Sequence, residues 1–347
     1  MQGLTCYGSA VILGLGGNPM RRREFITLLG GAVAGWPVAA RSEQPPAPLV
    51  GLLSGIDLDN RQLAALGQGL EEAGYVTGKN VAIEYRSAAG QYGQLRALAE
   101  GLVHRQPKVI VATGSLSAIL AVKAATTTIP IVFAVGVDPV KYGLIASFNR
   151  PGGNLTGVNF RSLELAAKRL EFLSELVPRA TTIAFLAGGS RFLTFDEQTD
   201  NIHTAARALG RQIIVSECRS EQDIDAAFTH IVDQRAGAVV VGVFPLFFER
   251  RNHDKILQLA AQHKIPAIYP IRSYVVAGGL MSYATDIGLY RQLGVNYVGR
   301  ILKGSKPADL PVEQASKFAL SINLKTAKAL GLEVPPMLLV RAHEVIE

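Results

Sequence analysis

The sequence predicts an α/β protein built from two doubly wound, Rossmann-like lobes, each with a parallel sheet, joined by crossover segments. Three observations lead to this fold class. Short, continuously apolar runs alternate with helical stretches, as expected for parallel strands whose faces are both covered by helices. The order of these elements then repeats at a nearly constant offset. Further elements follow the second copy.

The first copy begins with the strand-like run "PLVGLLS" at Pro48. A helix is predicted from Asn60 to Gly74, because leucines recur there at spacings of three and four. The strand "NVAIEY" and a helix from Gln91 to Arg105 follow. The apolar run "KVIVATG" is then a buried strand, and the next helix opens on Ser115. "IPIVFAV" is another buried strand.

The second copy repeats this order from "TTIAFLAGG" onward, and a helix is predicted from Asp196 to Leu209. "RQIIVSE", "AGAVVVGV" and "IPAIYP" parallel the later strands of the first copy. The offset is 133 residues from Val50 to Ile183 and 136 from Pro130 to Pro266. Such agreement over several elements indicates two similar lobes in tandem.

The C-terminal part departs from the repeat. It contains "GGLMSYATD", a predicted helix from Ile287 to Leu302, the strand-like "KFALSIN", and a short helix from Lys325 to Leu330. Extra elements after two complete lobes indicate that the chain crosses back between them. The predicted division is lobe one at 43–155 and about 275–308, and lobe two at 156–274 and about 309–347.

The stretch "MRRREFITLLGGAVAGWPVAARS", Met20 to Ser42, predicts an export signal. Arginines precede a short apolar region that ends in small residues, which is the three-part pattern of such signals. The run from Phe25 to Ala40 is shorter than the ~20 residues of a transmembrane helix. Its arginine pair resembles the twin-arginine signature. Cleavage is expected after Ala40 or Ser42, which makes residues 1–19 an upstream segment and places the mature protein in the periplasm.

Removing residues 1–42 leaves 31 basic and 27 acidic residues and lowers the formal charge from +7 to +4. No basic patch with interleaved aromatic residues remains, so nucleic-acid binding is not expected. Cys6 is removed with the signal, and Cys218 is then alone, which excludes an intramolecular disulfide. Cys218 ends an apolar run and is expected to be a small packing residue.

Ligands of open parallel sheets bind at the carboxyl ends of the strands, near the amino ends of helices. In lobe one this rule selects Ser54 and Gly55 in "LLSGID", and Thr113, Gly114 and Ser115 in "ATGSLSA". Hydroxyl and N–H groups there could hold a carboxylate, while Ser115 could also be only the helix N-cap. Asp138 in "AVGVDPV" could pair with a ligand ammonium group or simply order its turn.

In lobe two the same rule selects Gly189 and Ser190 in "LAGGSRF", and Phe244 and Phe247 in "GVFPLFFER". An aromatic loop over a cleft indicates an apolar or aromatic ligand, although core packing is the more usual fate of a single phenylalanine.

Patterns typical of catalysis are missing from the sequence. No Gly-x-Ser-x-Gly elbow and no phosphate-binding Gly-Lys-Ser/Thr loop occurs, and the six histidines lack metal-site spacing. The one Gly-x-Gly of the mature chain, at Gly67, lies inside a predicted helix and lacks the third glycine of a dinucleotide fingerprint. We therefore expect no enzyme activity, no metal site and no cofactor.

Two long motifs carry a family resemblance. "TTIPIVFAVGVDPVKYGLIASFNRPGGNLTGV" and "ILKGSKPADLPVEQASKFALSINLKTAKALGLEVPP", together with "GGLMSY" at Tyr283, resemble the ABC-transporter substrate-binding family that includes tryptophan- and phenylalanine-binding members. The resemblance runs from about Leu49 to the C-terminus, and Tyr283 is a further candidate ligand-binding residue. It implies the type I periplasmic binding protein fold, whose lobes close on a ligand by hinge motion. Many relatives carry an acidic residue before the aromatic pair of the lobe-two loop, where this chain has Phe244-Pro245-Leu246.

The resemblance implies a monomeric periplasmic component of an ABC importer, with a membrane permease as its partner. The expected ligand is an aromatic or branched amino acid, or an aromatic or apolar carboxylate. An exported sensor domain that feeds a membrane receptor uses the same cleft and is an alternative. An exported α/β enzyme is a further one, although no nucleophile–base pair supports it.

Overall fold

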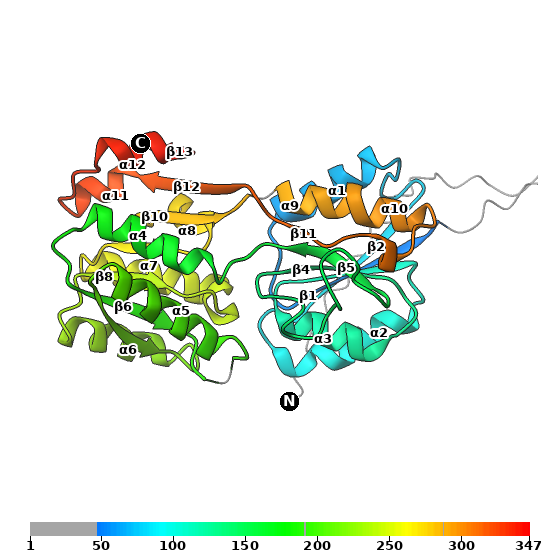
Figure 1. Cartoon of the computed structure of the whole chain (residues 1–347), viewed down its shortest axis with the longest axis horizontal. Coiled ribbons are helices and arrows are strands. Elements are labelled where there is room, and N and C mark those ends of the chain that lie inside the picture. The colour runs from blue at the N-terminus through cyan, green and yellow to red at the C-terminus, as the bar shows by residue number, and fades with distance from the viewer. Residues whose placement is uncertain (1–46, 191, 287) are drawn as a thin grey trace, which may run out of the picture. The chain divides into compact units, whose positions relative to one another are not determined.

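The computed structural model describes residues 47–190, 192–286 and 288–347. The predicted upstream segment and export signal, residues 1–42, lie outside these residues. Two sheets organise the described chain (Figure 1). No helix in the part of the chain that the structure describes is both long and apolar enough to cross a bilayer.

Lobe one is built on a six-stranded sheet in the order β11-β5-β4-β3-β1-β2, in which every recorded pairing is parallel. Its strands are β1 (Leu49–Ser54), β2 (Ala82–Ser87), β3 (Val109–Thr113), β4 (Ile131–Val135), β5 (Leu155–Asn159) and β11 (Glu313–Gln314). Its helices are α1 (Asn60–Glu72), η1 (Tyr92–Gln94), α2 (Leu95–His104), α3 (Leu116–Ala125), α9 (Gly288–Gln292), η3 (Leu293–Val298), α10 (Gly299–Leu302) and η4 (Pro307–Asp309). Strands β3, β4 and β5 are buried along their whole length, as continuous apolar runs predict.

Lobe two has a seven-stranded sheet in the order β13-β12-β10-β9-β8-β6-β7. Without the added edge strand β13, the strands follow the same order as in lobe one. Its strands are β6 (Thr182–Ala187), β7 (Gln212–Glu217), β8 (Ala238–Val241), β9 (Ala267–Tyr269), β10 (Met281–Thr285), β12 (Phe318–Asn323) and β13 (Glu344–Ile346). Its helices are α4 (Leu165–Leu176), α5 (Phe195–Ala208), α6 (Asp223–Asp233), η2 (Pro245–Phe248), α7 (Arg250–Gln262), α8 (Arg272–Val276), α11 (Leu324–Ala329) and α12 (Pro336–Arg341). The two doubly wound sheets confirm the predicted fold class, but the lobe-two sheet is not wholly parallel, because β12 runs antiparallel to β10.

The chain passes between the two sheets three times, from β5 to α4, from β10 to α9, and from β11 to β12. Three parts of the predicted division differ from the observed sheets. Residues 156–159 of β5 and residues 313–314 of β11 lie in the sheet of lobe one, whereas the prediction places them in lobe two. The prediction also places residues 275–285 in lobe one. Strand β10 instead pairs with β9 in parallel and with β12 in antiparallel orientation, inside the sheet of lobe two. Periodicity identifies a strand but not the sheet that it joins, so the sequence did not place this crossing.

The returning helices of lobe one pack tightly on its first helix, and Figure 1 shows α9 and α10 (orange) beside α1 (blue). Two glycines allow this approach. A Cβ atom on Gly69 would overlap the carbonyl oxygen of Arg291, and one on Gly294 would lie 2.7 Å from the carbonyl oxygen of Leu66. The segment that contains Gly294 is π-helical, a form found at sites of local adjustment in helices.

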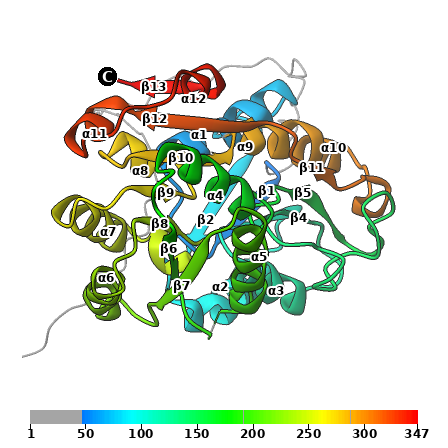
Figure 2. The ribbon, with the colours of Figure 1, turned by 60° about the vertical axis from the view of Figure 1, so that its left-hand side comes forward.

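The last elements of the chain gather at one edge of the second sheet, where α11, α12 and β13 lie near β12 (Figure 2).

Cys218 lies in the core of lobe two with no exposed surface, and burial raises its pKa to about 12. This confirms its expected role as a packing residue.

Candidate functional site

The carboxyl ends of β1 and β3 meet at one edge of the lobe-one sheet. Ser54 and Thr113 are register partners, and the Gly55 N–H donates to the Thr113 carbonyl at 3.0 Å. Both hydroxyl-bearing side chains are buried, with 0% and 1% exposure. Three of the predicted residues, Ser54, Gly55 and Thr113, therefore lie together, and we call this cluster the polar corner.

Gly114 and Ser115 join this corner through close backbone approach. Gly114 has a φ of 78°, which favours glycine, and a Cβ atom there would overlap the Ser54 hydroxyl. A Cβ atom on Gly55 would likewise overlap the Ser115 Oγ. Ser115 Oγ accepts from the Ala118 N–H at 3.1 Å, so Ser115 is the N-cap of α3. The N-cap interpretation is confirmed.

Tyr290, on helix α9, contacts the polar corner from the part of the chain that returns to lobe one. Its hydroxyl lies 3.5 Å from Thr113 Oγ1 and accepts from Gln62 Nε2 at 3.1 Å. Burial raises the pKa of Tyr290 to about 12. Sequence reasoning missed this residue, since it lies 177 positions from Thr113 and no local pattern links the two.

Asp138 is exposed and orders its own turn. Its Oδ1 accepts from the N–H groups of Val140 at 2.8 Å and Lys141 at 3.3 Å. The same loop reaches lobe two, because Lys141 Nζ pairs with Glu197 at 2.9 Å and the Tyr142 hydroxyl donates to Glu197 at 3.0 Å. The turn role of Asp138 is thus observed, and its contact with a ligand stays a prediction.

The lobe-two loop after β6 contains Gly189 and Ser190. Gly189 has a φ of 79°, and its carbonyl accepts from the Phe192 N–H at 3.2 Å. Ser190 is exposed. This turn directs Phe192, which the sequence analysis did not select, toward lobe one.

Phe244 and Phe247 were expected to form the apolar end of the cleft, but both have 0% exposure and lie in the core of lobe two. Phe244 contacts Phe192 at 5.6 Å between ring centroids. Phe192 in turn meets Tyr92 of lobe one edge to face at 6.4 Å. Tyr92 and Phe192 are therefore an aromatic pair that faces across the two lobes. The second of these belongs to the loop "LAGGSRF", which the strand-end rule had selected for its glycine and serine.

Tyr283 lies on β10, with its ring 5.0 Å from that of Phe172 on α4 and 5.9 Å from that of Phe318 on β12. Its carbonyl accepts from Arg169 Nε at 2.9 Å, and Arg169 Nη1 donates to the Ser162 carbonyl at 3.4 Å. Arg169 is 1% exposed, and burial lowers its pKa to about 9. It ties β10, which leads into the second crossover, to the first crossover segment, and no sequence pattern pointed to it.

Buried tyrosines predict a loss of stability in alkali. Burial raises the pKa of Tyr290 to about 12 from an ordinary value of 10, and raises those of Tyr269 and Tyr274 further. The folded chain then binds more protons than the unfolded chain above pH 10, so unfolding free energy falls with rising pH, by about 1.4 kcal/mol per pH unit for each such tyrosine.

Arg169 acts in the opposite direction, because its lowered pKa adds stability as the pH rises above about 9. Urea denaturation from pH 8 to 12 should therefore give a flat or slightly rising stability up to about pH 10 and a steep fall above it. A profile that stays flat to pH 12 would contradict the burial of these phenolic groups.

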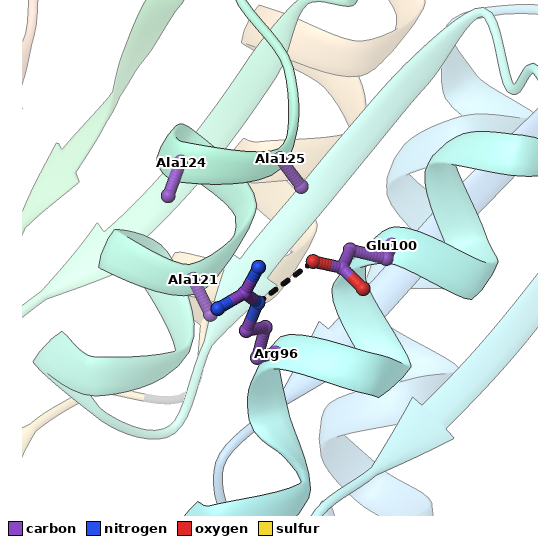
Figure 3. Close-up of a pocket in the computed structure, with 5 residues that line it drawn as sticks. All are labelled: Arg96, Glu100, Ala121, Ala124 and Ala125. Carbon is purple, nitrogen blue, oxygen red and sulfur yellow. Dashed lines mark hydrogen bonds and ion pairs between the residues drawn. The ribbon is translucent and has the colours of Figure 1, made fainter.

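A groove of about 410 Å³ lies on the outer surface of lobe one, between α2 and α3 (Figure 3). Arg96, Glu100, Ala121, Ala124 and Ala125 line it, and Arg96 pairs with Glu100 at 2.8 Å. None of the predicted ligand residues borders this groove, and its alanines lie in the later turns of α3, away from Ser115. It is separate from the candidate site.

Glu249 immediately precedes α7 and is a further residue that the sequence analysis did not select. A Cβ atom on Gly90 would overlap its Oε1, so this carboxylate lies against a loop of lobe one. Its Oε2 accepts from Asn252 Nδ2 at 3.4 Å.

Among the described residues no group of three or more His, Cys, Asp or Glu side chains is placed to hold a metal ion.

Residues 52–346 match the family described as ABC transporter substrate binding protein. The chain belongs to this family. A tyrosine-binding protein of Clostridioides difficile (strain R20291) is 26% identical to it over 274 residues, which cover 76% of this chain and 74% of that protein.

Solved structures of similar proteins support the same fold for this substrate-binding protein. The ABC domain from Streptococcus pneumonia in complex with L-Trp has a TM-score of 0.78 at 24% identity, covering 86% of this chain and 100% of that one. A conserved domain protein from Vibrio cholerae has a TM-score of 0.77 at 25% identity, covering 86% and 99%. The fold is that of the type I periplasmic binding proteins.

Proposed function

We propose that this substrate-binding protein captures an amino acid with an aromatic side chain between its two lobes and delivers it to the permease of an ABC importer. The observation that carries the proposal is the polar corner of lobe one beside Tyr92, which faces Phe192 of lobe two. Branched amino acids and aromatic carboxylates offer part of the same chemistry and are outcomes of the test below.

The polar corner suits the ligand carboxylate. The partly exposed Ser115 hydroxyl and the backbone around Gly114 lie at the amino end of α3, where N–H groups and the helix dipole favour an anion. The buried hydroxyls of Ser54 and Thr113 lie behind them. Helix α3 is 10 residues long. Ser115 would donate to the carboxylate while its Oγ continues to cap the helix.

The apolar end of the site is assigned to Tyr92 and Phe192, with Phe244 and Phe247 as buried support for Phe192. Edge-to-face contacts with aromatic rings favour a flat ligand side chain. The relative from Clostridioides difficile is named for tyrosine binding, and the Streptococcus structure holds L-Trp. Asp138, Gly189, Ser190 and Tyr283 are proposed as outer ligand contacts.

Three crossing segments favour closure by hinge bending around the bound solute. We propose that the protein works as a monomer in the periplasm after removal of the segment that starts at Met20, and that it captures the solute without chemical change.

A thermal-shift screen tests the proposed function. L-tyrosine, L-tryptophan, L-phenylalanine, L-leucine and 3-phenylpropionate are added to the mature chain, each at several concentrations. A ligand present at 100 times its Kd adds about 2.7 kcal/mol to the free energy of unfolding. At about 2–4 °C per kcal/mol this raises the melting temperature by about 5–10 °C. The aromatic amino acids should give the largest shifts.

A pair of variants locates the site. Asn and Asp both cap helices about as well as Ser. Ser115→Asn and Ser115→Asp should therefore melt close to the parent protein. Only Ser115→Asp places a negative charge beside the ligand carboxylate, and we expect it to lower affinity at least about tenfold below that of Ser115→Asn, or 1.4 kcal/mol. Equal affinities, or a screen without any shift, would show that the assignment is wrong.

A further inference from the structure

The proposed polar corner and aromatic pair account for the carboxylate and the side chain of an amino acid, but not for its ammonium group. The aromatic loop Phe244–Phe248 contains no carboxylate, and Glu249 follows it directly. The position of Glu249 against lobe one decides what this residue can bind.

Contacts lead from Glu249 to the polar corner in three steps. Gly90 has a φ of 81° and lies against the Glu249 carboxylate, where any Cβ atom would overlap Oε1 and lie 3.2 Å from Cγ. The Gly90 N–H donates to the Gly55 carbonyl at 2.9 Å. Gly55 in turn lies against Ser115 Oγ, and a Cβ atom there would be 3.2 Å from the ring of Tyr92. A carboxylate, an aromatic ring and the hydroxyl groups thus border the same glycine-lined wall.

Asn252 of helix α7 also orients the Glu249 side chain. Asn252, with 0% exposure, donates through Nδ2 to the Leu246 carbonyl at 2.9 Å and to Glu249 Oε2 at 3.4 Å. A buried amide that holds one carboxylate oxygen directs the group toward lobe one. A carboxylate placed in this way favours an ammonium group through charge-assisted hydrogen bonds.

We propose that Glu249 binds the ammonium group of the ligand and so makes the protein select zwitterionic aromatic amino acids over the corresponding desamino acids. The inference rests on the proposed function and adds a specificity-determining residue to it. Hydroxyl donors for the carboxylate, a carboxylate for the ammonium group and two aromatic rings together match one chemical class.

Isothermal titration calorimetry on the mature chain tests the proposal with two matched ligand pairs, L-tryptophan against indole-3-propionate and L-tyrosine against 3-(4-hydroxyphenyl)propionate. The parent protein should bind each amino acid at least about tenfold more tightly than its desamino partner. Glu249→Gln should lose about ten- to a hundredfold in affinity for the amino acids, the range for hydrogen bonds to charged groups. Its affinity for the desamino acids should change less than about twofold.

Glu221→Gln is the matched control, because Glu221 is a partly buried lobe-two carboxylate that pairs with Arg251 at 3.6 Å. It should leave both ligand pairs unchanged. Glu249→Asp retains the charge on a shorter side chain and should fall between the parent and Glu249→Gln.

The outcomes separate the two hypotheses. If the parent binds the amino acids and Glu249→Gln binds them equally well, the role of Glu249 is wrong while the proposed function stands. A parent protein that prefers the desamino acids would likewise show that Glu249 does not bind an ammonium group. If the parent binds neither class, both proposals are wrong.

Discussion

Gly69→Ala is expected to destabilise the protein by about 3 kcal/mol, although it adds only one methyl group. The new Cβ atom would overlap the carbonyl oxygen of Arg291, a backbone atom that cannot rotate away as a side chain would. Helix α1 would have to move from the α9–η3 segment, and with it the bond from Gln62 to Tyr290 beneath the polar corner. Urea denaturation with comparison of midpoints measures the effect.

Gly67→Ala, two residues earlier in the same helix, is the matched control. Nothing lies within 4 Å of a Cβ atom at Gly67, so alanine should stabilise α1 by about 0.5–1 kcal/mol. The two variants should shift the midpoint in opposite directions. A stabilising Gly69→Ala would contradict the close crossing of α1 and the returning helices.

Phe244→Ala is expected to lower the free energy of unfolding by about 3–5 kcal/mol, the range for a fully buried phenylalanine. Its ring has 0% exposure and contacts the rings of Phe185, Phe192 and Phe247. Gly188 and Gly242 both lie so close to it that a Cβ atom on either would meet the ring at 2.5–2.6 Å. Such a site has little freedom to collapse, and the cavity should remain. Denaturant unfolding at neutral pH gives the change.

Two neighbouring phenylalanines provide the comparison. Phe248 is only partly buried, so Phe248→Ala should cost far less stability than Phe244→Ala. Phe192→Ala should chiefly weaken ligand binding, since this ring faces Tyr92. A Phe244→Ala variant that keeps the parental midpoint while losing ligand affinity would show that Phe244 is a ligand contact and not part of the core.

The tandem repeat allowed the fold to be predicted because strand runs, helix spacing and the 133-residue offset are local properties of the chain. The rule that ligands lie at the carboxyl ends of parallel strands also selected Ser54, Thr113 and Ser115, which the structure brings together. These residues follow strands directly, so their position depends on little else.

Other features depend on tertiary contacts that no local pattern records. The sequence of an aromatic loop does not distinguish buried rings from exposed ones. Phe244 and Phe247 proved to be core residues. The candidate roles of Tyr92 and Glu249 follow from contacts between loops of the two lobes, which the sequence does not show. The sheet that β10 joins was decided by its pairing with β9 and β12.

The return of the chain to lobe one has a consequence for how the protein folds. Gln62 meets Tyr290 across 228 positions, and β11 adds to the edge of β5 after lobe two has been traversed. Contacts of such sequence separation raise the contact order and slow the search for the native state, because a long loop must close before they form. The complete first lobe, with β11 and its returning helices α9 and α10, can therefore form only after the chain has been synthesised as far as residue 314.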